Sequence, residues 1–250
     1  MRTCFDKPHL WSQAPSTLGR SIGRVDVWRV LLDQPVSAAL PESVLSPDEW
    51  TRAKRFRFER DHNRFVQCRT ALRHILSQYL RLPACEIRLD YQANGKPELA
   101  ADQNPERLRF NVAHSSELAL IAVGFQQRLG IDIERMRADI DIPALSEQCF
   151  SAREQASLLS LHADLRFQAF FACWTRKEAF IKATGEGLSF PLSDFTVAID
   201  PEGNPNIEEI RGDRSAAKSW YLTDLNLAND YYATLAVEGF PAMVKPYCWN

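Results

Sequence analysis

The 250-residue sequence lacks the hydrophobic segments that mark membrane and secreted proteins. No apolar run approaches the roughly 20 residues that cross a bilayer. Residues 1–20 also hold no apolar stretch of signal-peptide length. We therefore expect a cytoplasmic protein with no membrane partner.

Cysteine is scarce and scattered, with six residues in the whole chain and no CxxC pair. This distribution fits neither zinc-ligand spacing nor a dense disulfide framework. We expect reduced, mostly buried thiols.

Excess charge and the common nucleotide-binding motifs are also missing. The formal net charge is only −2, so the molecule as a whole shows no sign of a nucleic-acid partner. No GxxxxGK[ST] or GxGxxG segment occurs, which excludes the usual phosphate-binding loops. One stretch departs from this balance: residues 52–64 hold six basic and two acidic side chains. Such a stretch is either a solvated helix face or a site for phosphates or an acidic partner.

What is present is ordinary globular composition, 45% hydrophobic and 25% charged, in a pattern that repeats along the chain. Residues 1–24 are rich in Pro, Ser and Gly and read as a loosely attached leader. Ser46-Pro47 marks the start of a helix that runs, whole or broken, to about Leu82. Residues 25–126 and 127–250 each give strand, helices and then strands, which predicts two similar α+β halves with a site between them.

Two carboxylates lie two residues apart in the segment Gly130-Ile131-Asp132-Ile133-Glu134. On a strand this spacing points Asp132 and Glu134 to the same face. Two adjacent anions repel each other unless a cation sits between them, and all-oxygen ligands without His or Cys favour Mg²⁺ over Zn²⁺. The alternative is an edge strand whose polar face meets water.

Three further groups carry possible site chemistry. Glu178 and Lys182 lie one helical turn apart in WTRKEAFIK, as either a surface ion pair or ligands for metal and phosphate. His114 follows FNVA before an apolar strand, and Lys96-Pro97 follows the turn Asn94-Gly95. A structural histidine and a solvated hairpin lysine are the alternatives for these two.

Together these motifs resemble the phosphopantetheinyl transferases of the Sfp type. That family has an NGKP-like turn, an FN-x-x-HS segment, G-[IV]-D-[IV]-E and W-[ST]-x-K-E-[SA]-x-x-K, in this order. All four occur here across residues 94–182. The resemblance implies a pseudodimer of two α+β halves, with coenzyme A in the cleft between them and the metal ligands in the second half.

The resemblance also implies a role for each site residue. Asp132, Glu134 and Glu178 would hold Mg²⁺, or Mn²⁺, against the pyrophosphate of coenzyme A. Glu178 would serve as the base and Lys182 would neutralise the leaving group. Contacts to coenzyme A would come from the following residues: Arg52, Arg64, Lys96, Pro97, His114, Lys177 and Lys182.

The implied reaction moves 4'-phosphopantetheine from coenzyme A to a serine of an apo acyl or peptidyl carrier protein, and the implied state is a monomer. Two positions depart from the family pattern: Ala113 replaces a frequent serine, and Glu49 replaces a basic residue of some relatives. Two alternatives stay open, a magnesium-dependent nucleotide phosphoryl transferase and a noncatalytic relative that binds coenzyme A or a carrier protein.

Overall fold

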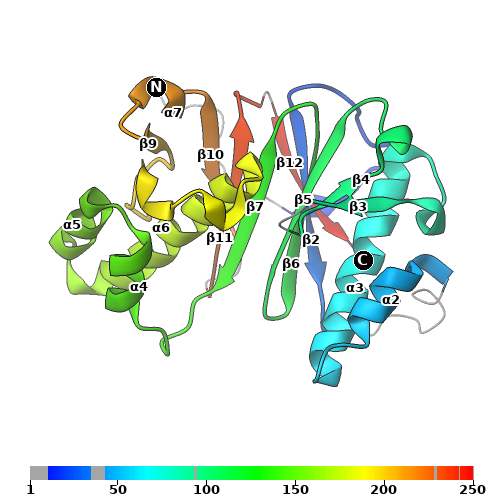
Figure 1. Cartoon of the computed structure of the whole chain (residues 1–250), viewed down its shortest axis with the longest axis horizontal. Coiled ribbons are helices and arrows are strands. Elements are labelled where there is room, and N and C mark those ends of the chain that lie inside the picture. The colour runs from blue at the N-terminus through cyan, green and yellow to red at the C-terminus, as the bar shows by residue number, and fades with distance from the viewer. Residues whose placement is uncertain (1–10, 35–42, 93–94, 228–229, 242, 250) are drawn as a thin grey trace.

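The computed structural model describes residues 11–34, 43–92, 95–227, 230–241 and 243–249. In this part of the chain two β-sheets lie face to face between two long helices, as Figure 1 shows. The mixture of helices and mainly antiparallel strands confirms the predicted α+β class.

The larger sheet has five strands in the order β1-β12-β2-β6-β5. Their bounds are β1 (Ser12–Gln13), β2 (Arg24–Leu31), β5 (Leu108–Ser115), β6 (Leu118–Phe125) and β12 (Met243–Trp249). Every residue of β6 is buried because both faces of this sheet are covered, and a continuous apolar run is what such a strand requires.

One face of the larger sheet packs against helix α3 (Glu59–Leu80), through Leu72, Ile75 and Leu76. The shorter α2 (Pro47–Ala53) precedes it, so the predicted helix from Ser46 is broken after Ala53. Ser46 and Glu49 form a capping box at the start of α2, as the sequence indicates. The hairpin of β3 (Leu89–Tyr91) and β4 (Pro97–Leu99) completes this side of the molecule.

The smaller sheet has the order β10-β11-β7 and lies under helix α6. Its strands are β7 (Leu129–Arg135), β10 (Trp220–Asp224) and β11 (Tyr231–Glu238). Around it lie α4 (Ile142–Cys149), α5 (Ala152–Ser160), α6 (Ala163–Thr184), α7 (Arg214–Ala217), β8 (Phe195–Val197) and β9 (Ile207–Ile210). A Cβ atom at Gly130 would lie 2.2 Å from the carbonyl oxygen of Ala179, so glycine is what lets β7 approach α6 this closely.

The two sheets share an apolar core. Val25 and Val27 of the larger sheet pack with Ile131, Ile133 and Leu235 of the smaller one. Each sheet is covered by a helix on its other face. Strand β5 of the larger sheet lies against strand β7 of the smaller one, and we call this line of contact the seam. That seam holds the candidate site.

Chain order and sheet order differ at the two ends of the molecule. The last described strand, β12, pairs in parallel with β2, so it lies in the sheet of residues 25–126 and not with the rest of residues 127–250. Residues 1–10 of the predicted leader lie outside the described residues. In the rest of the predicted leader, β1 pairs with β12 and Leu18 is buried. The pairings of β12 with β2 and with β1 have no local sequence signal, because the paired strands lie more than 200 positions apart in the chain. The five described cysteines are free thiols, as predicted, but they are not mostly buried, since only Cys68 and Cys173 are buried.

Candidate active site

Asp132 lies at the centre of the seam, on β7, with only 4% of its side chain exposed. Its Oδ1 accepts a hydrogen bond of 2.6 Å from Nζ of Lys182, which projects from the last turn of α6. Its Oδ2 is buried and has no hydrogen-bond partner among the described residues. A buried carboxylate oxygen without a partner is costly, so this atom is suited to a cation or a donor supplied by a ligand.

Glu134 and Glu178 bring two more carboxylates to the same place. Glu134 is half-buried on β7, and its Oε2 accepts a 3.0 Å hydrogen bond from the hydroxyl of Ser115 at the end of β5. Burial, and then the charge of Asp132, raise the pKa of Glu134 above its usual value. The same two causes raise the pKa of Glu178, on α6. The three acids therefore act on one another electrostatically, across two elements that are far apart in the chain.

Lys182 lies among these acids. Burial acts to lower its pKa, but the charge and hydrogen bond of Asp132, with smaller contributions from Glu178 and Glu134, raise the pKa above the usual value. The lysine is therefore a fixed cation. Lys182 pairs with Asp132 instead of forming a surface ion pair with Glu178, because α6 turns its last two turns towards β7.

The donor set fits a hard divalent cation, since it consists of carboxylate oxygens and includes the unpartnered Oδ2 of Asp132. In the described part of the chain, however, no three His, Cys, Asp or Glu side chains are arranged around a common point as a metal site. The ammonium of Lys182 is the cation that Asp132 contacts in this arrangement.

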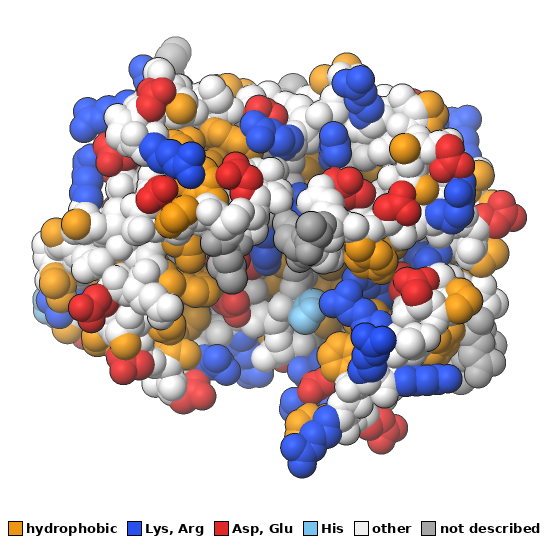
Figure 2. All heavy atoms as spheres, in the orientation of Figure 1, with side chains coloured by type: hydrophobic (Ala, Val, Ile, Leu, Met, Phe, Trp, Pro, Cys, Tyr) orange, Lys and Arg blue, Asp and Glu red, His pale blue; other side chains and the backbone are white. Residues whose placement is uncertain are grey.

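A cavity of about 360 Å³ beside the seam brings together four of the residues predicted to bind coenzyme A: Arg52, Arg64, Pro97 and His114. Partial desolvation, followed by the positive charges of Lys182 and Arg69, lowers the pKa of His114. Figure 2 shows Lys and Arg side chains gathered at the edge of a central hollow in this face of the molecule. This cavity is suited to an anion.

Lys96 lines a second cavity, of about 430 Å³, and its neighbour Pro97 lines both cavities. Its Nζ donates to the carbonyl oxygen of Lys182 at the end of α6. Burial lowers the pKa of Lys96 to about 8. The β3–β4 hairpin thus brings Lys96 against the end of α6. Asn94 of the predicted turn lies outside the described residues.

Lys177 is not in the cleft, so the prediction that it contacts coenzyme A is wrong. The side chain is 1% exposed, and Nζ donates to both carboxylate oxygens of Glu154, at 2.8 and 2.7 Å, and to the carbonyl oxygen of Phe195. Residues 177 and 182 are five positions apart, so they project from different faces of α6. Lys177 secures α6 to α5 and β8.

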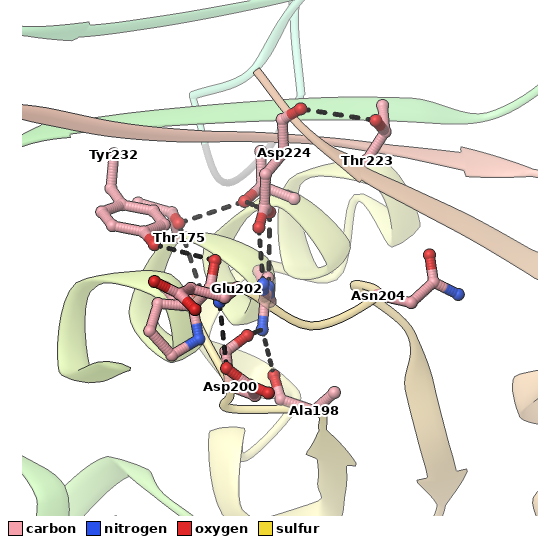
Figure 3. Close-up of polar contacts among 12 residues, drawn as sticks. Thr175, Ala198, Asp200, Glu202, Asn204, Thr223, Asp224 and Tyr232 are labelled. Atoms are coloured by element: carbon pink, nitrogen blue, oxygen red, sulfur yellow. Dashed lines mark hydrogen bonds and ion pairs between the residues drawn. The ribbon is translucent and has the colours of Figure 1, made fainter. Parts of the chain in front are cut away.

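Two neighbours of Lys177 anchor the same helix. The guanidinium of Arg176 is fully buried, contacts Asp224 at 2.5 Å and donates to the carbonyl oxygens of Ala198 and Asp200 (Figure 3). The hydroxyl of Thr175 contacts that of Thr234, which is paired with Asp132 across β11 and β7. In the motif WTRKE, residues 175–177 therefore fix the helix, and Glu178 is the member turned to the seam.

The structure adds roles for two residues to which the sequence analysis assigned none, although Ser115 belongs to the FN-x-x-HS segment. Ser115 bonds Glu134 and also accepts the backbone N–H of Arg135, tying β5 to β7. Arg69 lines the cavity of about 360 Å³. A signal for Arg69 was available, since it follows Arg64 and Phe65 within the helix that the sequence predicts from Ser46 to about Leu82. Glu49, the departure noted above, is buried and bonded to Arg73 at 2.6 Å, outside the cavity.

Comparison with known proteins agrees with these motifs. Residues 128–236 match the 4'-phosphopantetheinyl transferase superfamily, and residues 33–126 match the N-terminal region of a 4'-phosphopantetheinyl transferase. The 4'-phosphopantetheinyl transferase HetI of Nostoc sp. is 36% identical over 93% of this chain and 95% of its own length. The 4'-phosphopantetheinyl transferase Sfp of Bacillus subtilis is 31% identical over 73% of this chain and 80% of its own.

Among solved structures, the holo-[acyl-carrier-protein] synthase of Thermotoga maritima matches with a TM-score of 0.36 and 20% identity, over 46% of this chain and 65% of that one. The relationship to HetI extends over nearly the whole of both chains. The chain therefore belongs to the 4'-phosphopantetheinyl transferase family.

Proposed function

We propose that this protein transfers 4'-phosphopantetheine from coenzyme A to a serine hydroxyl of an apo acyl or peptidyl carrier protein. The supporting observation is the meeting of Asp132, Glu134, Glu178 and Lys182 at one seam, beside a cationic cavity. In the reaction the serine oxygen forms a bond to the phosphorus next to pantetheine. The bond from that phosphorus to the bridging pyrophosphate oxygen breaks, and adenosine 3',5'-bisphosphate leaves.

Asp132, Glu134 and Glu178 are proposed to hold Mg²⁺, or Mn²⁺ in its place. When bound, the ion would neutralise the charge that develops on the pyrophosphate. The support from this chain is its all-oxygen donor set and the unpartnered Oδ2 of Asp132. Ser115 would hold Glu134 in position through its 3.0 Å hydrogen bond.

Glu178 is proposed to accept the proton of the attacking serine, directly or through a water molecule. Burial and the charge of Asp132 raise the pKa of this carboxylate, which favours its action as a base, whereas a bound Mg²⁺ would lower that pKa again. Lys182 would exchange its contact with Asp132 for the departing phosphate, because both are anionic oxygens within reach of one ammonium. Glu178 would thus serve both as a metal ligand and as the base, and Lys182 would stabilise the leaving group.

Coenzyme A is proposed to lie along the cavity wall, with Arg52, Arg64, Lys96 and His114 near its phosphates and Pro97 against its nucleotide. Arg64 now forms two hydrogen bonds of 2.6 Å with Asp33, so binding would require that pair to open or to share its guanidinium. The family match and the predicted motifs support this placement.

The carrier protein is proposed to approach over the basic residues of α2 and the start of α3, since such carriers are typically acidic helical bundles. Arg55, Phe56 and Tyr91 line an open groove there. A monomer that works in the cytoplasm without nucleic-acid or membrane partners, and with two pseudodimeric halves, remains our prediction. Among the described residues, no helix has the length and apolar character to cross a membrane.

The proposal is tested by incubating the protein with coenzyme A, Mg²⁺ and a panel of apo carrier proteins, followed by intact-mass measurement. We expect the carrier to gain one phosphopantetheine group, and Asp132→Ala to abolish the gain while leaving the melting temperature near normal. A carrier that binds without gaining mass would identify the noncatalytic alternative instead. Transfer to a nucleotide would identify the phosphoryl transferase.

A further inference from the structure

Lys182 is a cation that the three acids of the seam share. Its Nζ donates a 2.6 Å hydrogen bond to Oδ1 of Asp132, and its charge also acts on Glu134 and Glu178. Within the part of the chain that the structure describes, these three carboxylates take part in no other ion pair. Part of the negative charge that would attract a divalent cation is therefore balanced by one ammonium.

The fold holds this ammonium against Asp132. Lys182 lies in the last turn of α6, and its carbonyl oxygen accepts a hydrogen bond from Nζ of Lys96. Gly130, two residues before Asp132 on β7, lets this turn approach so closely that a Cβ atom there would lie 2.8 Å from the carbonyl carbon of Lys182. The ion pair therefore joins two packed elements, and the side chain of Lys182 is its flexible part.

A second cation at Asp132 would lie next to this ammonium. Oδ2 of Asp132 is buried without a hydrogen-bond partner among the described residues, and it belongs to the same carboxylate as Oδ1. Only 4% of the Asp132 side chain is exposed, so little water is present to screen the two positive charges from each other. Lys182 and a divalent cation therefore oppose each other at Asp132, although both are attracted to it.

Lys182 is also the member of the pair that can move to an anion. Its side chain is 30% exposed, whereas that of Asp132 is almost fully covered. A phosphate oxygen forms a charge-assisted hydrogen bond with an ammonium and competes for it more strongly than water does. Since linkage between two ligands is reciprocal, an anion that draws Lys182 away raises the affinity of Asp132 for a cation, and the cation favours the anion by the same factor.

We infer that Lys182 restrains the metal site: its contact with Asp132 keeps the affinity for a divalent cation low until the phosphates of coenzyme A draw the ammonium away. Lys182 thereby couples the binding of the two ligands. The inference deepens the proposed function and rests on it for the identity of both ligands. It gives Lys182 a role before the chemical step, in addition to the one proposed at the leaving group.

The test measures the binding of Mn²⁺ to the full chain without coenzyme A, by calorimetric titration and by electron paramagnetic resonance of the free ion. Lys182→Met keeps the side-chain length but removes the charge, so it should bind Mn²⁺ about 10- to 100-fold more tightly than wild type. Lys182→Arg keeps the charge and should stay within about threefold of wild type. Asp132→Ala should lose the binding, which locates the ion at the seam.

Arg137→Met is the matched control for a general loss of positive charge near the seam. Arg137 is exposed and paired with Asp139, and its charge also acts on Glu134. The Mn²⁺ affinity of this variant should change less than about threefold, because solvent screens an exposed charge. A second titration adds saturating coenzyme A, and the resulting gain in Mn²⁺ affinity should be about tenfold larger or more in wild type than in Lys182→Met.

Equal Mn²⁺ affinities of wild type and Lys182→Met would overturn the inference, as would equal gains when coenzyme A is added. Should Lys182→Met melt below wild type, Lys182→Gln decides, since it is neutral but still donates a hydrogen bond; a wild-type affinity in that folded variant counts against the inference. The absence of Mn²⁺ binding in all of these proteins also counts against it. If wild type transfers no phosphopantetheine but Lys182→Met still binds Mn²⁺ more tightly, the proposed function fails while the role of Lys182 stands.

Discussion

Lys177 and Lys182 belong to one helix and one sequence motif, yet they differ in burial and in the groups that they contact. Lys177 is buried and contacts Glu154 and a backbone carbonyl oxygen. Lys182 keeps 30% of its side chain exposed and contacts Asp132, whose Oδ2 has no hydrogen-bond partner among the described residues. A buried and fully paired cation stabilises a fold, while a partly exposed cation among acids can exchange its partner for a phosphate. Burial and pairing thus distinguish the structural Lys177 from Lys182, the lysine proposed to act in the transfer.

Glu178→Gln tests the proposed base. The substitution preserves shape but removes the negative charge and the proton affinity, so turnover should fall about 10²-fold or more. The melting temperature should stay near that of wild type. Steady-state kinetics beside thermal melts measure both quantities, and Glu202→Gln, an exposed acid between β8 and β9, is the control. Near-normal turnover in the folded Glu178→Gln variant would remove Glu178 from the chemistry.

Lys96 predicts a pH dependence of coenzyme A binding. Its pKa is about 8, below the usual lysine value, so it is a cation below pH 8 and becomes neutral as the pH rises above it. If its charge is required for binding, affinity should fall by up to about tenfold per pH unit above pH 8. Lys96→Arg remains charged in this range and should bind with little pH dependence. Titrations of both proteins from pH 7 to about 9.5 measure this, and identical profiles would show that Lys96 does not contribute.

At the level of elements, α6 is firmly anchored and carries two of the residues proposed to act in the transfer. Arg176 and Lys177 secure its centre to the loop after β8, to β10 and to α5, and Gly130 lets its last turns lie directly on β7. Glu178 and Lys182 are therefore placed on secondary structure, not on a loop. Such support holds catalytic groups in a fixed geometry.

Lys177→Met measures the anchoring of α6. It leaves the carboxylate of Glu154 buried without its cation, and such a loss typically costs about 3–5 kcal/mol of unfolding free energy. Urea denaturation should show this decrease. Lys218→Met, an exposed lysine after α7, should change stability by less than about 0.5 kcal/mol. A Lys177→Met protein with wild-type stability and impaired coenzyme A binding would restore the role that the sequence first indicated.

At the scale of the whole molecule, the site exists only because two sheets meet. β5 contributes His114 and Ser115, β7 contributes Asp132 and Glu134, and the apolar core between the sheets holds the two strands together. Asn111 reinforces the seam, since its buried Oδ1 accepts a 2.8 Å hydrogen bond from the backbone N–H of Ile131. β12 adds a second link by returning the chain to the larger sheet.

We expect the protein to unfold in a single cooperative transition, because neither sheet can bury its inner face without the other. Asn111→Ala should lower the unfolding free energy by about 1–3 kcal/mol, since it leaves the N–H of Ile131 buried and unpaired. Calorimetry should show one peak for both proteins, moved to lower temperature in the variant. Two separate peaks would contradict the shared core and indicate halves that fold independently.

The sequence by itself determined the α+β class, the start of α2, strand β6 and the membership of Asp132, Glu134, Glu178 and Lys182 in one motif set. These depend on local signals: capping residues, apolar runs and residue order. Only the tertiary structure decided that Lys177 is an anchor, that Arg69 faces the cavity and that β12 lies beside β2. A side chain's partner and a strand's neighbour are chosen by segments distant in the chain, through burial and pairing that no local pattern records.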